Sequence, residues 1–138
     1  MAVILITGSS TGIGLATAVA FGRAGHDVYA TMRNSSAAPE LASIAAAENL
    51  PIKVLPMDVD DDASVGRGMQ RAIDAAGRID VLVNNAGIML LGAVEELPLD
   101  DFRRIMETNY FGALRCIQAV IPGMRERRSG HIINIIQA

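Results

Sequence analysis

The residues best suited to chemistry in this sequence form a glycine-rich turn near its beginning. The turn reads Thr7-Gly8-Ser9-Ser10-Thr11-Gly12-Ile13-Gly14. An apolar run precedes it and a helix-forming run follows it, and this arrangement aims backbone N–H groups and a helix dipole at a phosphate. Glycine leaves the room that a Cβ would take from the tight turn or from a pyrophosphate. The spacing therefore predicts a phosphate-binding turn, and the alternative is a flexible loop between two core elements.

The composition excludes several kinds of protein. A chain of 138 residues can bury the core of one domain, and a net charge of −3 provides no basic stripe for nucleic acid. The single cysteine, Cys116, excludes an internal disulfide and a cysteine metal cluster, so we expect no metal site. Cys116 falls within a helical apolar pattern, which predicts a small residue of the core.

The beginning of the chain could also be interpreted as a targeting segment. No charged residue precedes Arg23, and Ala16-Thr17-Ala18 resembles a cleavage site of small residues. A signal peptide needs a basic start and an unbroken apolar core, whereas glycine, serine and threonine interrupt the apolar run here. The same interruption argues against a membrane span, which needs about 20 mainly apolar residues. We therefore expect a soluble, cytoplasmic protein.

Apolar runs and helical patterns alternate along the chain with little linker between them. The expected strands cover about residues 3–7, 26–32, 52–57, 81–83 and 131–136. The expected helices cover about residues 13–24, 39–48, 60–77 and 100–127. The acidic residues Asp60, Asp61 and Asp62 are suited to begin the third helix, and we expect Pro122 to bend the fourth.

This alternation predicts an α/β fold, a doubly wound parallel sheet of about five strands with helices on both faces. The expected strand order is 3-2-1-4-5, and a ligand then binds outside the carboxyl ends of strands one and four, where the order reverses. The segments Thr7–Gly14 and Asn84–Gly87 follow those two strands. Motifs far apart in the chain are therefore predicted to meet at one site.

The two segments carry a family resemblance. Thr7–Gly14 resembles the TGxxxGxG motif of the short-chain dehydrogenase/reductase family, and Asn84-Asn85-Ala86-Gly87 resembles its NNAG motif. The resemblance covers residues 2–136, about the first half to three-fifths of a typical member. It implies a Rossmann-type domain over 1–138, a nicotinamide dinucleotide cofactor and carbonyl–alcohol oxidoreduction. It also implies homo-oligomers built on the helix at 100–127.

The resemblance further implies the residues that bind the cofactor. Asp58 corresponds to the family aspartate that contacts the adenine ring, although it could also be one more carboxylate at a helix start. The small residues Ala86 and Gly87 would leave room for ribose and nicotinamide. The full expected set is Thr7, Gly8, Ser10, Thr11, Gly12, Ile13, Gly14, Arg33, Asp58, Val59, Asn85, Ala86 and Gly87.

The end of the second strand indicates which cofactor is preferred. A site for NAD(H) places an acid there, to accept hydrogen bonds from the ribose hydroxyls. Met32 stands in that place and Arg33 follows it. A guanidinium can pair with a 2′-phosphate, so we expect NADP(H) to be preferred over NAD(H). The alternative is that Arg33 is an ordinary solvated arginine.

Asn109 is the one candidate residue with a supporting catalytic role. It continues the stripe of Phe102, Ile105 and Met106, which predicts a polar side chain on a core-facing helix surface. By residue pattern alone it is equally well a hydrogen-bonded core amide. In the family, the corresponding asparagine holds a water relay behind the catalytic lysine. Two other polar residues, Asp80 and His131, are interpreted as structural.

The sequence departs from the family where the reaction would occur. The family pattern continues with a catalytic Ser and a Tyr-x-x-x-Lys pair, whereas this chain reads Ile136-Gln137-Ala138 and neither Tyr29 nor Tyr110 has a lysine four residues on. We expect an incomplete N-terminal part of an oxidoreductase, truncated after the fifth strand and inactive alone. The alternative is a catalytically silent NADP(H)-binding module that acts through a partner. A methyltransferase or epimerase relative is disfavoured by the paired motifs.

Overall fold

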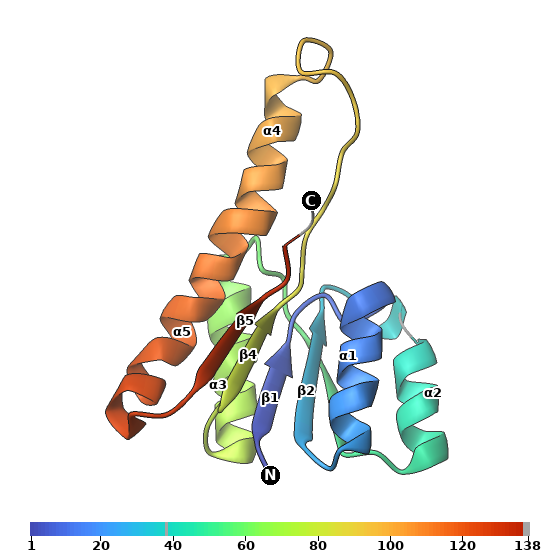
Figure 1. Cartoon of the computed structure of the whole chain (residues 1–138), viewed down its shortest axis with the longest axis vertical. Helices are drawn as coiled ribbons and strands as arrows, with labels where there is room; N and C mark the ends of the chain where they lie inside the picture. The colour runs from blue at the N-terminus through green and yellow to red at the C-terminus, as the bar shows by residue number, and fades with distance from the viewer. Residues whose placement is uncertain (38, 137–138) are drawn as a thin grey trace.

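The computed structural model describes residues 1–37 and 39–136, which form one parallel sheet with helices on both faces (Figure 1). The strands are β1 (Val3–Ile6), β2 (Asp27–Met32), β3 (Ile52–Pro56), β4 (Val81–Asn84) and β5 (His131–Asn134). The helices are α1 (Gly12–Arg23), α2 (Pro39–Glu48), α3 (Asp62–Ala76), α4 (Leu99–Met106) and α5 (Gly112–Arg127), with a short 3₁₀ turn at Ser35–Ala37. The strand order is β3-β2-β1-β4-β5, which confirms the predicted fold class and order.

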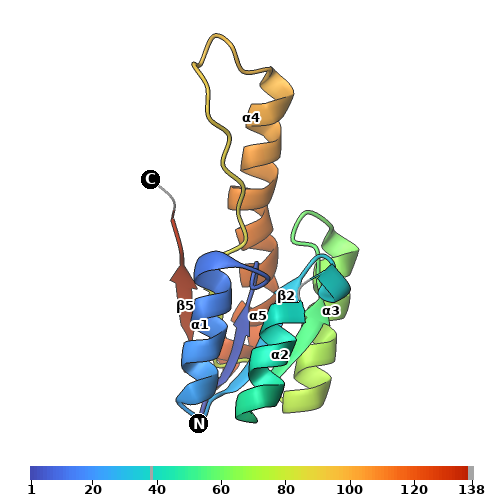
Figure 2. The ribbon, with the colours of Figure 1, turned by 90° about the vertical axis from the view of Figure 1, so that its right-hand side faces the viewer.

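The core is divided by the sheet, because side chains of one strand point alternately to its two faces. From β1, Ile4 and Ile6 pack with Ala18 and Leu41 against α1 and α2. The intervening Leu5 packs on the other face, with residues of α3 and α5. Figure 2 shows α1 and α2 in front of the sheet and α5 behind it. The central strand is therefore covered on both faces, as a doubly wound sheet requires.

Cys116 lies in this core and is fully buried, as predicted. Burial in apolar surroundings raises the pKa of its thiol to about 12. The thiol is therefore neutral at physiological pH and acts as a small apolar side chain.

The expected acidic start of α3 is confirmed at two of its three aspartates. The Asp61 carboxylate precedes the helix and accepts hydrogen bonds from the N–H groups of Ala63 and Ser64. Its neighbour Asp62 begins the helix, and Asp60 contacts a different element described below. The helix ends at Gly77, whose φ of 89° is readily available only to glycine.

The fourth predicted helix has the expected bounds but is less regular than expected. α4 and α5 are joined by a π-helical segment, Glu107–Phe111, in which the N–H of Gly112 donates to the carbonyl of Glu107 five residues earlier. We expected the irregularity at Pro122, but α5 continues through this residue. In Figure 1, α4 and the loop before it project beyond the carboxyl ends of the strands. The α4 end of this helix therefore lies away from the sheet.

The last strand is shorter than the sequence suggested, ending at Asn134 instead of residue 136. Gln137, the position where the family has its catalytic serine, lies outside the described residues. Over the described ranges, no helix combines the length and the apolar character needed to cross a bilayer.

Candidate functional site

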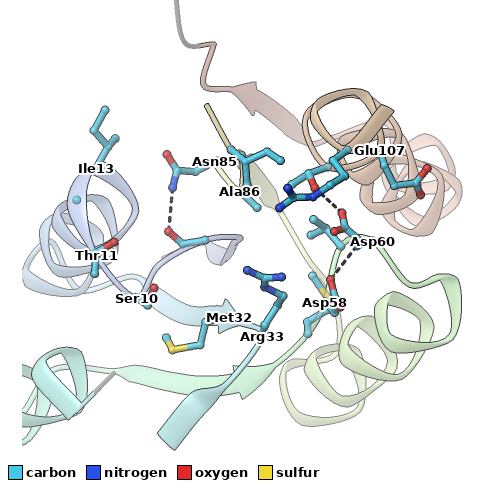
Figure 3. A pocket seen from close by; sticks show the side chains of 18 residues that line it. Ser10, Thr11, Ile13, Met32, Arg33, Asp58, Asp60, Asn85, Ala86 and Glu107 are labelled. Carbon is cyan, nitrogen blue, oxygen red and sulfur yellow. Dashed lines mark hydrogen bonds between the residues drawn. The ribbon is translucent and has the colours of Figure 1, made fainter. Parts of the chain in front are cut away.

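A cleft of about 450 Å³ lies at the carboxyl ends of the strands, where the glycine turn and the Asn84–Gly87 turn meet (Figure 3). It lies where the strand order reverses, the place predicted from the alternation of strands and helices. Its lining residues are Gly8, Ser10, Thr11, Gly12, Ile13, Met32, Arg33, Met57, Asp58, Val59, Asp60, Asn85, Ala86, Gly87, Ile88, Arg104, Glu107 and Thr108. The predicted cofactor residues are thus brought together, except that Thr7 and Gly14 lie behind this surface.

Thr7 joins the two turns that form the cleft. It is 1% exposed, and its hydroxyl oxygen accepts hydrogen bonds from the N–H groups of Asn85 (3.1 Å) and Ala86 (3.0 Å). The Asn85 side-chain amide donates in turn to the carbonyl of Gly8 (2.9 Å). Both turns are therefore fixed to each other before any ligand binds. Thr7 positions the site and does not line the cleft.

The glycines of the first turn serve different purposes. A Cβ on Gly8 would lie 2.7 Å from the Cα of Ala86, and one on Gly14 would lie 2.2 Å from the carbonyl oxygen of Gly8. These two glycines therefore allow protein segments to pack together, which is the tight-turn alternative offered by the sequence. Gly12 has a φ of 59° and no atom within 4 Å of its Cβ position. Open space at the N-terminus of α1 is compatible with a pyrophosphate.

Arg33 lies in the cleft at the position where the sequence predicts it. Met32 ends β2 and is buried, and the exposed Arg33 side chain extends between the glycine turn and the segment carrying Asp58 and Asp60 (Figure 3). Among the described residues, Arg33 has no ion pair or hydrogen bond through its side chain. Its guanidinium is therefore available to an anionic ligand.

The wall opposite the glycine turn contains polar residues whose contacts the sequence pattern did not indicate. The Asp58 carboxylate accepts a hydrogen bond from the N–H of Asp60 (3.0 Å), and the Asp60 carboxylate accepts one from the Thr108 hydroxyl (2.8 Å). Arg115 donates to the carbonyl of Val59 (3.0 Å) and pairs with the carboxylates of Glu107 and Asp62. These carboxylates raise the pKa of the Arg115 guanidinium.

The prediction that Asn109 faces the core was wrong. Asn109 is exposed, as is Met106 on the same expected stripe, whereas Thr108 is the buried residue of this turn. The Asn109 amide accepts from the N–H of Ile88 (2.8 Å) and donates to its carbonyl (2.9 Å). The alternative was a hydrogen-bonded amide in the core. Its hydrogen bonds are confirmed, but its burial is not, because Asn109 is exposed. Its role in a relay stays a prediction.

A second cleft of about 450 Å³ adjoins the first and is more apolar. Its lining residues are Thr7, Val59, Asn84, Asn85, Ala86, Gly87, Asn109, Tyr110, Ala113, Leu114, Ile117, Asn134, Ile135 and Ile136. Among its lining residues the Asn84 amide donates to the side-chain oxygen of Asn134 (3.0 Å), while the buried Oδ1 of Asn84 has no hydrogen-bond partner within the described residues.

The two residues interpreted as structural lie away from both clefts. The Asp80 carboxylate accepts a hydrogen bond from the N–H of Val3 (2.8 Å) and pairs with Arg78 (3.0 Å), so it fastens the start of β1 to the start of β4. His131 is exposed at the beginning of β5. In the part of the chain that is described, no three side chains that commonly bind metals are grouped together.

Comparison with known proteins gives consistent matches along the chain. Residues 2–137 match the family described as short chain dehydrogenase. The chain is 40% identical to 3-ketodihydrosphingosine reductase of Bacteroides thetaiotaomicron, covering 96% of this chain and 46% of the relative. It is 42% identical to human retinol dehydrogenase 8, covering 96% of this chain and 43% of the relative. The chain thus spans about half the length of the curated relatives it matches.

Solved structures give the same result. Actinorhodin polyketide ketoreductase, solved as a variant with NADPH, has a TM-score of 0.93 at 30% identity, covering 99% of this chain and 53% of that chain. A gluconate 5-dehydrogenase from Burkholderia cenocepacia, in complex with NADP and tartrate, has a TM-score of 0.89 at 34% identity, with the same coverage. The resemblance inferred from the two motifs is therefore confirmed, and this chain belongs to the short-chain dehydrogenase family.

Proposed function

We propose that this chain forms the dinucleotide-binding part of a short-chain oxidoreductase and binds NADP(H) in preference to NAD(H). The cofactor, when bound, supplies or accepts the hydride that interconverts a carbonyl and an alcohol. Ser10, Thr11 and Gly12 at the N-terminus of α1 would hold its pyrophosphate. Asp58 and Val59 would bind the adenine side, and the turn at Asn85–Gly87 would bind the nicotinamide side.

The observation that carries the NADP(H) preference is Arg33 in the cleft beside the apolar Met32. No carboxylate lies at the end of β2 to accept hydrogen bonds from the ribose hydroxyls. The Arg33 guanidinium has no acidic partner within the described residues. A free guanidinium favours a phosphate through charge-assisted hydrogen bonds. Two solved relatives named above contain NADP or NADPH, which supports the same choice.

Fluorescence titration of the chain with NADPH and with NADH tests this preference. We expect NADPH to bind more tightly by roughly 1.5–3 kcal/mol, or about 10- to 150-fold. Arg33→Ala should remove most of the difference, whereas Arg67→Ala, an exposed arginine on α3 outside the cleft, should leave it unchanged. Equal affinities in the wild-type chain would contradict the proposal.

We further propose that the 138 residues by themselves bind cofactor without turning over a substrate. Protonation of the alkoxide formed by hydride transfer needs a general acid, worth typically 10²–10⁴-fold, and these residues contain no Tyr-x-x-x-Lys pair. The assay is NADPH oxidation over a panel of aldehydes, ketones and quinones. Steady turnover that persists after removal of host reductases would disprove it. A silent chain that binds NADPH and captures one specific partner would favour the alternative of a binding module.

We also propose that copies of the chain associate through the helix at 99–127. Two aromatic side chains on this helix, Tyr110 (52% exposed) and Phe111 (46% exposed), contact each other at the surface, and Ile121 is exposed further along. Exposed aromatic groups of this kind are typical of interfaces. Light scattering after size exclusion should show a dimer or larger species that Phe111→Lys weakens, and a monomer at high concentration would oppose the proposal.

A further inference from the structure

Three residues on one side of the long helix contact the segment between β3 and α3. They are Thr108, Gly112 and Arg115, spaced i, i+4 and i+7, and we call them the helix stripe. All three lie against residues 57–62, the segment that forms one wall of the first cleft. This spacing places side chains on one face of a helix, so the stripe can act as a unit.

The contacts of the helix stripe are close and varied in kind. The Thr108 hydroxyl donates to the Asp60 carboxylate at 2.8 Å. Gly112 is buried, and a Cβ there would lie 2.9 Å from the Cγ2 of Val59, so the backbone itself packs on this side chain. Arg115 donates to the carbonyl of Val59 at 3.0 Å and pairs with Asp62. The helix stripe thus holds this segment at Val59, at Asp60 and at Asp62.

The segment that the helix stripe holds is the part of the cleft assigned to the adenine side of the cofactor. Asp58 and Val59 both line the cleft, and the Asp58 carboxylate accepts a hydrogen bond from the N–H of Asp60. A displacement of Asp60 would therefore also move Asp58. The next residue after Thr108 is Asn109, which holds Ile88 on the neighbouring wall. Two consecutive residues of the π-helical segment thus fix two walls of one cleft.

We propose that the helix stripe is a positioning element for the cofactor, acting through Asp58 and Val59 on the adenosine half that NADPH and NADH share. This inference rests on the proposed function, in which the first cleft binds the dinucleotide. It predicts an equal effect on the affinities for NADPH and NADH, which the proposed function alone does not predict. Loss of the helix stripe lowers the affinity for both cofactors by the same factor, because their difference is set by Arg33 on another part of the cleft.

The experiment compares four variants with the wild-type chain and one control. Arg115→Gln removes the charge and the forked donor, Arg115→Lys keeps the charge, Thr108→Val removes the hydroxyl, and Thr108→Ser keeps it. The control is Arg71→Gln, an exposed arginine on α3 that contacts no group of the cleft in the described residues. Each protein is titrated with NADPH and NADH, and amide hydrogen exchange of residues 57–62 is followed without cofactor.

We expect Arg115→Gln and Thr108→Val to raise both dissociation constants by about three- to tenfold, with an unchanged NADPH-to-NADH ratio. Exchange of residues 57–62 should become faster in both. Thr108→Ser should behave as wild type, Arg115→Lys should be intermediate, and Arg71→Gln should change nothing. Where Arg115→Gln fails to fold, the milder pair at position 108 provides the same comparison.

Three results would overturn the inference. Wild-type affinity in both Arg115→Gln and Thr108→Val would show that the contacts do not position the binding wall. A changed cofactor ratio would show that the helix stripe reads the 2′-phosphate instead. Weaker binding without faster exchange at 57–62 would place the effect elsewhere. Failure of the wild-type chain to bind either cofactor would overturn the proposed function as well, which separates the two claims.

Discussion

β1 (Val-Ile-Leu-Ile) and β5 (His-Ile-Ile-Asn) both have apolar residues at their two middle positions, but their surroundings are very different. β1 pairs with β2 on one side and β4 on the other, and its Leu5 is completely buried. β5 pairs with β4, and among the described residues nothing pairs with its other edge (Figure 1). Its Ile133 is 40% exposed. At these middle positions, place in the strand order decides how much of an apolar side chain is buried.

The same contrast applies to the turns that follow the strands. After β1 and β4, one hydroxyl of Thr7 holds two backbone N–H groups, and the two turns form a fixed floor for the first cleft. At the end of β5, Asn134 bonds to Asn84, yet the buried Oδ1 of Asn84 has no hydrogen-bond partner in the part of the chain that is described. The molecule is thus well ordered by its own contacts at its centre and has unused hydrogen-bonding capacity toward its edge.

The largest expected difference between the two strands is in stability. Leu5→Ala should lower the free energy of unfolding by about 2–5 kcal/mol, because it leaves a cavity in a fully buried site. Ile133→Ala should cost less than about 1.5 kcal/mol, because this side chain is partly in water already. Urea unfolding of both variants measures the contrast. Equal losses would mean that β5 is as well packed as β1.

A smaller effect is expected at the hydroxyl that joins the central turns. Thr7→Val should destabilise the chain by about 1–3 kcal/mol, because two backbone N–H groups lose their acceptor. Thr7→Ser keeps the oxygen and should recover most of this loss. Thermal unfolding of the three proteins tests the point, and no difference between valine and serine would show that the hydroxyl is not what matters.

The buried thiol should make stability fall at high pH. The pKa of Cys116 is raised in the folded chain from 9.0 to about 12, so the neutral thiol stabilises the fold fully below pH 9. This stability is lost as the pH rises from 9 toward 12, at about 1.4 kcal/mol per pH unit. The measurement is the free energy of unfolding at each pH for wild type minus that for Cys116→Ala. The subtraction removes the other groups, because they titrate in both proteins.

Thiol labelling provides a direct control for that prediction. In native conditions at pH 8, iodoacetamide should modify Cys116 only as fast as the chain unfolds. The double variant Cys116→Ala with Ile133→Cys should be modified rapidly, because position 133 is exposed. Equally fast labelling of both would mean that the centre of the sheet opens as readily as the edge.

The smallest effect on stability is expected from a charge at the edge. Ile133→Lys should change the free energy of unfolding by only about 0.5–1 kcal/mol, and it should reduce self-association by discouraging strand pairing. Sedimentation velocity at several concentrations measures the second effect. Unchanged association would assign self-contact to the helix at 99–127 alone.

The sequence was sufficient for the fold and for the location of the first cleft. The alternation of strands and helices predicted the strand order, and Gly12 with Asn85 identified the two turns that meet there. Individual side-chain contacts were less predictable. Gly8 and Gly14 pack against backbone of segments that only the folded sheet brings close.

The helix after β4 was the least predictable element. A periodic stripe of apolar residues assumes that a helix lies flat on the sheet, whereas α4 projects beyond it, so Met106 and Asn109 are exposed. Arg115 and Thr108 were missed because polar residues on a helix usually face solvent. The available signal was their spacing with Gly112, a small residue between two polar ones on the same face.

The strand order also affects how the chain is completed during synthesis. β1 is made before the other four strands of this sheet but is a central strand, and 77 positions separate Ile4 from its partner Val81 on β4. At roughly 5–20 residues per second, a ribosome needs about 4–15 s to supply that neighbour. During this interval one edge of β1 is open, although β2 has already emerged. A sheet that forms before β4 is made lacks β4 and β5. The open edge of β1 can then pair with other chains, so the nascent chain needs protection during this interval.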